Sequence, residues 1–353
     1  MPGRRPTEVM TVLGPISSEG LGTTMCHEHL YLDNQRSWRG AEHPVARRFA
    51  EKPVSIEDLG TLHDDPYLSL DNQRLTDVEL TIAELAPYAA AGGRTILDPT
   101  CRGMGHDPLA VRRISEESGL HVVLGCGYYL QRTHPPEVAT SSIEELAARI
   151  ESDVRDGIDG SGVRPGFIGE IGVSPDFTSD EEKCLRAAAR AQARTRIPLS
   201  VHLPGWLRYG EWVLDVIEEE GADPGATILC HQNPSHDDPD YQARLAMRGA
   251  FLEYDMLGMG FLYPGEGQSP SDDQAAVAIR ELIGSGFGAQ ILLSSDVFLK
   301  MMLSAFGGMG YAHVLERFVP RLRRHQVPER AITRMLIDNP RALFEAASNG
   351  GSA

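Results

Sequence analysis

The segment MCHEHLYLDN, residues 25–34, places His27 and His29 on either side of Glu28 at the end of a short apolar run. Alternate side chains of a β-strand point the same way, so the two imidazoles would project from one face of a strand. Neighbouring imidazoles suit a divalent metal ion and fit a hydrophobic core badly. Because short His-X-His strings also arise by chance, the prediction of a metal site depends on further ligands along the chain.

Further ligand types do follow other apolar runs, at the point where each run ends. They are Glu170 in GFIGEIGVS, His202 in IPLSVHLP, His231 in ATILCHQN and Asp296 in QILLSSDVF. One buried histidine is ordinarily a hydrogen-bonded packing residue, but several imidazoles and carboxylates buried together are costly unless cations compensate them. The mixed nitrogen and oxygen donors predict two divalent metal ions per chain, with Zn²⁺ as the first choice and Mn²⁺, Co²⁺ or Fe²⁺ as alternatives.

The elements that must position these residues alternate between short apolar runs and amphipathic segments. The predicted strands cover residues 23–30, 94–100, 121–129, 166–174, 197–204, 226–233, 250–257 and 290–298. Residues 142–158 and 179–195 are typical of the helices between them, the second with Ser179 as its expected N-cap. No G-x-G-x-x-G follows the first strand, which disfavours a dinucleotide-binding sheet. The pattern predicts an α/β fold, a (β/α)₈ TIM barrel whose strand ends bring the ligands to a binuclear metal site at its C-terminal face.

The whole chain, residues 1–353, is predicted to be one hydrolase barrel. Residues 1–22 are expected to form an N-terminal hairpin or cap, and residues 346–353 a flexible tail. Residues 34–67 are too long for an ordinary βα connection and are interpreted as a loop over the barrel mouth. The segment MMLSAFGGMGY, residues 301–311, could be a lid, although ordinary packing is the commoner outcome for such a sequence.

Composition narrows the classes of partner. With 33 basic and 50 acidic residues the formal charge is −17, which argues against nucleic acid or an anionic membrane as a partner. No stretch has the length and apolar character of a signal peptide or a membrane span, so a cytoplasmic location is expected. The five cysteines are odd in number and lack C-x-x-C spacing, which favours buried thiols. A small molecule is the expected partner, and a homodimer and a monomer both stay open.

The motifs HEHL, GFIGEIGVS, CHQN, EYDMLG, LLSSD and GGMGYAHVLERFVP resemble the phosphotriesterase family of the amidohydrolase superfamily, over almost the whole chain. The resemblance is greatest to its phosphotriesterase-related and phosphotriesterase-homology proteins. It implies that His27, His29 and Asp296 hold one metal, that His202 and His231 hold the other, and that Glu170 bridges them. Phosphotriesterases bridge their metals with a carboxylated lysine on the fourth strand. None of the three lysines, Lys52, Lys183 and Lys300, falls there, and Glu170 would supply the bridging oxygens instead.

The resemblance also implies a reaction. A hydroxide between the metals would attack the substrate, and Asp296 would take up the proton and pass it to the leaving group. A carboxylic ester, lactone or amide is the expected substrate, with phosphotriester hydrolysis as the alternative. A non-catalytic small-molecule-binding barrel is the alternative from another class. A mononuclear, deaminase-like site is disfavoured because it would lack a carboxylate at Glu170.

Four further residues are candidates for contact with the substrate. Tyr128 and Asp255 lie near the ends of the third and seventh predicted strands, and each is as consistent with simple packing as with binding. Arg102 and Lys300 could bind an anionic group, although loop cations are more often solvated. Glu28 alternates away from its histidine neighbours, so it is expected to face the barrel wall and is assigned no chemistry.

Overall fold

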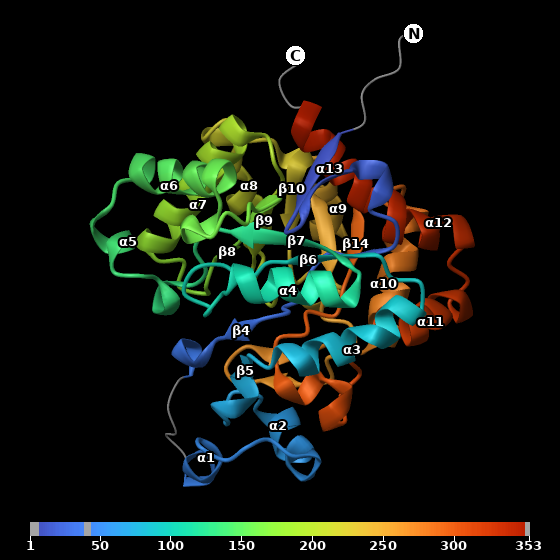
Figure 1. Cartoon of the computed structure of the whole chain (residues 1–353). Helices are drawn as coiled ribbons and strands as arrows, with labels where there is room; N and C mark the ends of the chain where they lie inside the picture. Colours follow the sequence, from blue (N-terminus) through green and yellow to red (C-terminus); the bar gives the residue numbers. More distant parts are fainter. Residues whose placement is uncertain (1–6, 39–43, 350–353) are drawn as a thin grey trace.

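A barrel of eight parallel strands forms the centre of the computed structural model, which describes residues 7–38 and 44–349 (Figure 1). Around the barrel the strands follow one another in chain order, from β3 through β6 to β11 and then β14. Each strand lies inside one predicted run, so the predicted (β/α)₈ barrel is confirmed. The strands are β3 (Thr24–Met25), β6 (Thr95–Asp98), β7 (His121–Cys126), β8 (Phe167–Gly172), β9 (Leu199–His202), β10 (Thr227–Leu229), β11 (Phe251–Tyr254) and β14 (Ile291–Leu293).

The barrel closes between its first and last strands through the residues that follow β3 and β14. The Asp296 amide donates a hydrogen bond to the His27 carbonyl at 3.0 Å, and the His29 amide donates to the Val297 carbonyl at 3.3 Å. The Ser294 hydroxyl also donates to the His27 carbonyl, at 2.8 Å. Closure therefore fixes the predicted ligands of the first strand against that of the last.

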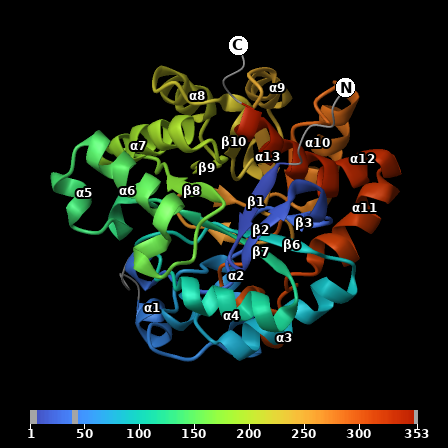
Figure 2. The same cartoon turned by 45° about the horizontal axis from the view of Figure 1, so that its top comes forward.

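Helices surround the barrel (Figure 2). They are α3 (Val78–Ala90), α4 (Pro108–Ser118), α5 (Glu137–Thr140), α6 (Ile143–Asp156), α7 (Ser179–Thr195), α8 (Gly210–Glu219), α9 (Pro239–Met247), α10 (Asp272–Gly284), α11 (Val319–Arg324), α12 (Glu329–Thr333) and α13 (Asn339–Asn349). The predicted N-cap of α7 is wrong by one residue. Thr178 caps this helix, because its hydroxyl accepts from the Glu181 amide while the Glu181 carboxylate accepts from the Thr178 amide.

Apolar side chains fill the interior of the barrel. Leu97, Val123, Phe167, Ile228 and Leu292 are buried there in one cluster with Val9 and Phe344 from the two ends of the chain. Alternate residues of these strands, such as Val122 and Leu124, belong instead to the larger cluster between barrel and helices. All five cysteines are free and buried, as predicted. No helix in the described part of the chain is long and apolar enough to cross a membrane.

The two ends of the chain cover the end of the barrel remote from the predicted mouth. A hairpin of β1 (Glu8–Thr11) and β2 (Gly14–Ser17) lies in the predicted cap region beside α13 (Figure 1). The predicted tail begins too early, because residues 346–349 continue α13, which buries Leu343, Phe344 and Ala347. Residues 350–353 of the predicted tail lie outside the described residues.

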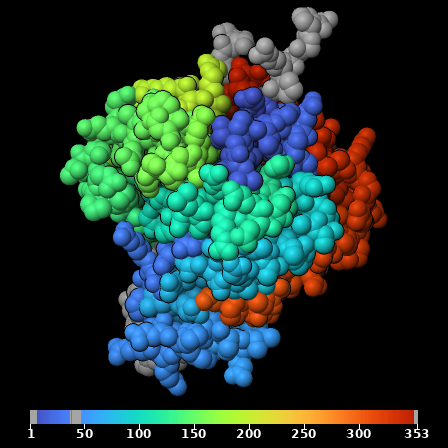
Figure 3. Space-filling view, in the orientation of Figure 1, coloured from blue at the N-terminus to red at the C-terminus, as the bar shows by residue number. Residues whose placement is uncertain are grey.

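The opposite end of the barrel carries the predicted long loop. Residues 34–67 contain α1 (Pro44–Phe49) and α2 (Leu59–Asp64), so the segment is partly helical where an irregular loop was expected. The 3₁₀ turn before α2 has a capping box of Ser55 and Asp58, and α2 buries Leu62. Figure 3 shows this segment as a layer at the bottom of the molecule, beside the chain near residue 300. Residues 39–43 lie outside the described residues.

Candidate metal centre

Three of the predicted ligands surround one point at the mouth, together with one oxygen of Glu170. The His27 Nε2 atom lies 3.6 Å from both Glu170 Oε1 and Asp296 Oδ1. The His29 Nε2 atom lies 3.6 Å from Glu170 Oε1 and 3.3 Å from Asp296 Oδ1. Ligand atoms about 2.0–2.2 Å from a tetrahedral zinc ion are roughly 3.3–3.6 Å apart, so this spacing is that of a metal site.

Two of these atoms have no hydrogen-bond partner although they are buried. They are His27 Nε2 and Asp296 Oδ1, and no partner for them occurs among the described residues. Buried polar atoms in native proteins nearly always have hydrogen-bond partners. Two buried atoms that lack one and face the same point therefore require an explanation. A cation between them satisfies both, and the donor chemistry therefore fits a metal ion.

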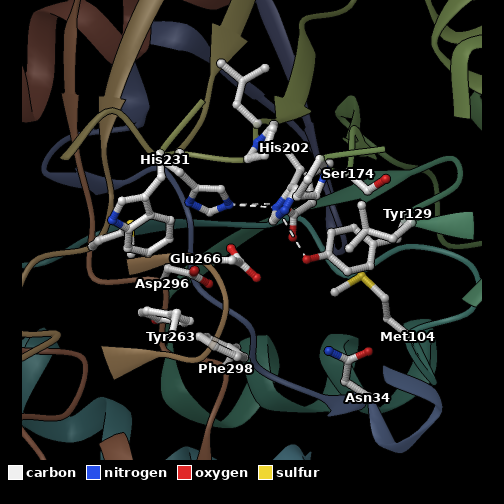
Figure 4. A pocket seen from close by; sticks show the side chains of 18 of the residues that line it. Asn34, Met104, Tyr129, Ser174, His202, His231, Tyr263, Glu266, Asp296 and Phe298 are labelled. Carbon is white, nitrogen blue, oxygen red and sulfur yellow. Dashed lines mark hydrogen bonds and ion pairs between the residues drawn. The ribbon is translucent and has the colours of Figure 1, made fainter. Parts of the chain in front are cut away.

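The second donor set consists of His202, His231 and the other oxygen of Glu170. The His202 Nδ1 atom lies 3.0 Å from Glu170 Oε2 and 2.7 Å from His231 Nε2. The His231 Nε2 atom lies 3.7 Å from the same carboxylate oxygen. Glu170 thus places one oxygen in each set. Figure 4 shows the His202 and His231 rings facing one another, joined by a dashed line.

The charges of the cluster alter its proton affinities. Burial alone would lower the pKa of His29, but the Asp296 and Glu170 carboxylates outweigh burial and raise that pKa to about 9. Burial opposes the charged form of His231 too, yet Asp255 and Glu170 raise its pKa to about 10. Burial would raise the pKa of Glu170, but the surrounding imidazoles, His27 first, hold it well below its usual range. Glu170 is therefore held as an anion within the cluster.

The backbone at two of these residues is held in the left-handed region. His231 has φ 59° and Asp296 has φ 47°, a conformation that costs about 1–3 kcal/mol for residues other than glycine. Buried carboxylates hold both. The Asp255 carboxylate accepts from the His231 amide at 2.9 Å, and the Glu28 carboxylate accepts from the amides of Ser295 and Val297, each at 2.8 Å.

Sequence reasoning missed the residues that orient the imidazoles. The Glu253 carboxylate lies 3.0 Å from His27 Nδ1, and the Thr100 hydroxyl lies 2.7 Å from His29 Nδ1. Such partners fix the tautomer and direction of a metal-binding imidazole. Glu253 and Asp255 could have been found together, because their spacing in EYDMLG gives both side chains the same direction on a strand. Glu28 and Thr100 carry no comparable signal.

The position before Glu170 requires a glycine. A Cβ atom there would lie 2.2 Å from the Ser200 carbonyl oxygen, and the residue has φ +120°. Only glycine allows β8 to approach β9 this closely and so places Glu170 next to His202.

A cavity that is partly open to solvent lies over the donor sets. Its walls are rich in aromatic and apolar side chains, with Tyr129 and Met104 opposite Tyr263 and Phe298 in Figure 4. The ends of the predicted mouth loop contribute Asn34 and Tyr67. None of the residues 301–311 lines the cavity that the described residues form.

Two candidate substrate contacts lie elsewhere. Tyr128 is fully buried and does not line the cavity, whereas Tyr129 does, with its hydroxyl 3.3 Å from His202 Nδ1. Tyr128 continues the set of Val122 and Leu124, which face the helices, whereas Tyr129 continues the set of Val123, which faces the barrel interior. Asp255 is also fully buried and bonds His231 rather than facing the cavity.

The two candidate anion-binding cations are engaged in ion pairs. Arg102 is buried and binds Asp153 through both terminal nitrogens, at 2.5 and 2.7 Å, and Asp159 at 2.8 Å. Lys300 pairs with Asp71 at 2.5 Å. Neither residue lines the cavity. Both predictions of substrate contact are therefore wrong.

Comparisons with known proteins agree with the fold. Residues 7–344 match the model of a family described as the phosphotriesterase family. An N-acetyltaurine hydrolase from Tetraodon nigroviridis is 34% identical over 341 residues, which are 95% of this chain and 97% of that protein.

Two solved structures are similar along nearly the whole chain. A resiniferatoxin-binding protein from Rhodobacter sphaeroides is 52% identical, with a TM-score of 0.95 and coverage of 98% of this chain and 96% of that one. A phosphotriesterase homology protein from Escherichia coli, complexed with phosphate in its active site, is 26% identical, with a TM-score of 0.75 and coverage of 92% and 99%.

Proposed function

The chain belongs to the phosphotriesterase family, and from this premise we propose that it is a binuclear metal-dependent hydrolase of a small carboxylic amide, ester or lactone. It would belong to the amidohydrolase superfamily, with Glu170 in the place of a carboxylated lysine. Zn²⁺ is the first choice of metal, and Mn²⁺, Co²⁺ or Fe²⁺ would suit the same donors.

One observation carries the proposal: the Glu170 carboxylate gives one oxygen to each of two donor sets. His27, His29 and Asp296 would hold one ion, and His202 and His231 the other. A single-metal site would use only one of the two oxygens of this buried carboxylate as a metal ligand. A barrel that only binds ligands would have no need of six converging metal-binding side chains, whose burial is costly in the absence of cations.

When bound, two divalent cations polarise a carbonyl oxygen and lower the pKa of a coordinated water to about 7. The protein side chains supply the remaining steps. Asp296 accepts the proton of the attacking water on a carboxylate oxygen and delivers it to the departing nitrogen or oxygen. Tyr129, whose hydroxyl lies beside His202, can donate a hydrogen bond to the substrate oxygen that gains negative charge. The apolar walls exclude bulk water from the reaction.

The relatives bear on the bond that is cleaved. An N-acetyltaurine hydrolase cleaves an amide, and its likeness over 95% of this chain favours an amide as the substrate here. Phosphotriester hydrolysis is the alternative, since the Escherichia coli relative accommodates phosphate in its active site. The name of the Rhodobacter sphaeroides relative favours a second function, a barrel that binds an apolar small molecule without cleaving it. The aromatic walls of the cavity suit such a ligand too.

Metal analysis together with a substrate panel tests the proposal. Wild type reconstituted with zinc should contain two ions per chain and hydrolyse amides or esters. The Glu170→Ala variant should retain at most one ion, with kcat/KM lower by about 10³-fold or more. Glu84→Ala, which removes a buried carboxylate outside the site, serves as the matched control and should retain both ions. Two ions in Glu170→Ala would refute the bridge, and tight binding of substrates without turnover by the loaded wild type would establish the binding function.

A further inference from the structure

Arg132 is the one arginine or lysine among the described residues that line the cavity. It belongs to the 3₁₀ turn Gln131–Thr133, which follows β7 directly after Tyr129 and Leu130. The other charged groups of the lining, apart from the imidazoles, are the carboxylates of Glu170, Asp296 and Glu266. A substrate that extends from the metal centre to the mouth therefore meets a single guanidinium.

The backbone under Arg132 is firmly held. The Gln131 amide donates to the Glu181 carboxylate at 2.9 Å, and the Thr133 hydroxyl donates to the Leu130 carbonyl at 2.8 Å. His134 Nε2 lies 2.7 Å from the Tyr129 carbonyl oxygen. Because the turn is fixed on both sides, the position of Arg132 relative to Tyr129 is fixed as well, while its side chain is exposed at the rim.

The guanidinium of Arg132 has no ion-pair partner within residues 7–38 and 44–349, although this chain is strongly acidic. Arginines on the outer helices behave differently, since Arg186 pairs with Glu182, Glu219 and Glu220, and Arg194 pairs with Glu144 and Glu151. Arg102 and Lys300 are similarly engaged. Arg132 thus offers planar paired donors, the geometry that suits a carboxylate or sulfonate, at the mouth of a cavity.

Tyr129 connects this cation with the reacting centre. Its ring packs edge-on against the His202 ring, with centroids 4.9 Å apart, and it lies three residues before Arg132. We propose that Arg132 is a specificity-determining residue that binds an anionic group, carboxylate or sulfonate, at the end of the substrate remote from the scissile bond. The inference depends on the proposed function, and it names the substrate class as anionic amides or esters. Glu266 would repel an anion from the other part of the mouth.

Three N-acetyl amides of matched length test the inference in the zinc-loaded enzyme. N-acetyl-β-alanine carries a carboxylate, N-acetyltaurine a sulfonate and N-acetylethanolamine an uncharged hydroxyl at the same distance from the amide. In Arg132→Gln the ratio of kcat/KM for the anionic amides to that for the uncharged amide should fall at least fivefold, mainly through KM, and Arg132→Lys should restore part of the ratio. A larger loss for one anion identifies whether carboxylate or sulfonate is preferred.

Arg330→Gln, which removes the same charge from α12, is the matched control and should leave the ratio unchanged. Binding of 4-oxopentane-1-sulfonate, 5-oxohexanoate and 5-hydroxypentan-2-one, which lack the scissile nitrogen, gives a readout that needs no turnover. Arg132→Gln should weaken binding of the two anions at least fivefold relative to the alcohol. An unchanged ratio and unchanged binding in Arg132→Gln would overturn the inference while leaving the hydrolase intact. Absence of hydrolysis of any amide or ester by wild type would instead refute the proposed function.

Discussion

The Glu28 carboxylate holds the peptide groups on either side of Asp296. Its Oε1 atom accepts from the Ser295 amide and its Oε2 atom from the Val297 amide, each at 2.8 Å, and the Ser294 hydroxyl oxygen lies 2.9 Å from Oε1. Asp296 has φ 47°, so these bonds hold a backbone that would otherwise relax. Glu28, between the two histidines of the first strand, is therefore a positioning residue for the ligand of the last strand.

The Glu28→Gln variant should bind metal more weakly by about 10–100-fold, as variants of residues that orient metal ligands do. Glutamine replaces one acceptor oxygen by an amide that cannot accept from the backbone, so one of the two peptide groups loses its partner. Competition with a chromophoric chelator measures the affinity. The variant should also lose about 1–3 kcal/mol of unfolding free energy, because it leaves a buried amide unsatisfied.

Glu84 provides a matched control for Glu28. Its carboxylate also accepts from two consecutive amides, those of Ser304 and Ala305, and from the Ser304 hydroxyl. These bonds hold a turn that does not line the cavity. The Glu84→Gln variant should lose comparable stability and keep its metal affinity. Equal losses of metal affinity in both variants would show that Glu28 acts only through stability.

The convergence of the candidate ligands at one mouth could be predicted from the sequence because each follows a short apolar run. His27, Glu170, His202, His231 and Asp296 come from five different strands, and a parallel barrel brings the carboxyl ends of its strands to one mouth. No detail of side-chain packing was needed for that inference. The convergence of the six groups is thus a property of topology, which the alternation of runs and amphipathic segments already specifies.

The substrate contacts could not be predicted in this way, because they lie beyond the strand ends. Past Cys126 the chain leaves β7, and of the two tyrosines that follow, Tyr129 lines the cavity and Tyr128 does not. Arg102 forms ion pairs with Asp153 and Asp159, which lie 51 and 57 residues further along the chain. No local sequence pattern predicts such distant partners. The cation of the cavity, Arg132, also lies beyond the end of β7, in the 3₁₀ turn Gln131–Thr133, and was missed for the same reason.

Two buried carboxylates should control the two metals separately. Asp255 bonds His231 Nδ1 and Glu253 bonds His27 Nδ1, each at 3.0 Å. In Asp255→Asn the ion held by His202 and His231 should be lost first on titration with chelator, and in Glu253→Gln the ion held by His27, His29 and Asp296. Each affinity should fall by about 10–100-fold. Stepwise chelation, with the metal content measured at each step, distinguishes the two. Loss of both ions together in each variant would contradict separate control.

Replacement by phenylalanine should have different effects at Tyr128 and at Tyr129. The Tyr128 hydroxyl is buried without a hydrogen-bond partner among the described residues, so Tyr128→Phe should be neutral or stabilising by roughly 1 kcal/mol. Tyr129→Phe removes the hydroxyl beside His202, so kcat/KM should fall by about tenfold or more with little change in stability. Denaturant unfolding and steady-state kinetics measure the two effects. A larger kinetic loss in Tyr128→Phe than in Tyr129→Phe would reverse the assignment.

Arg102 should matter for stability and leave catalysis untouched. Its side chain is 6% exposed and that of Asp153 is 3% exposed. Removing the guanidinium therefore leaves a buried carboxylate without its counter-ion. Arg102→Met should therefore cost about 3–5 kcal/mol of unfolding free energy, and the double variant Arg102→Met/Asp153→Leu should recover much of that loss. Lys300→Met removes the cation of a more exposed pair, 20% and 27% exposed, and should cost less than about 1 kcal/mol. The folded fraction of each variant should keep the wild-type kcat/KM for anionic amides, because neither cation lines the cavity. A rise in KM for those amides in Arg102→Met, with no such rise in Lys300→Met, would indicate that Arg102 contacts the substrate.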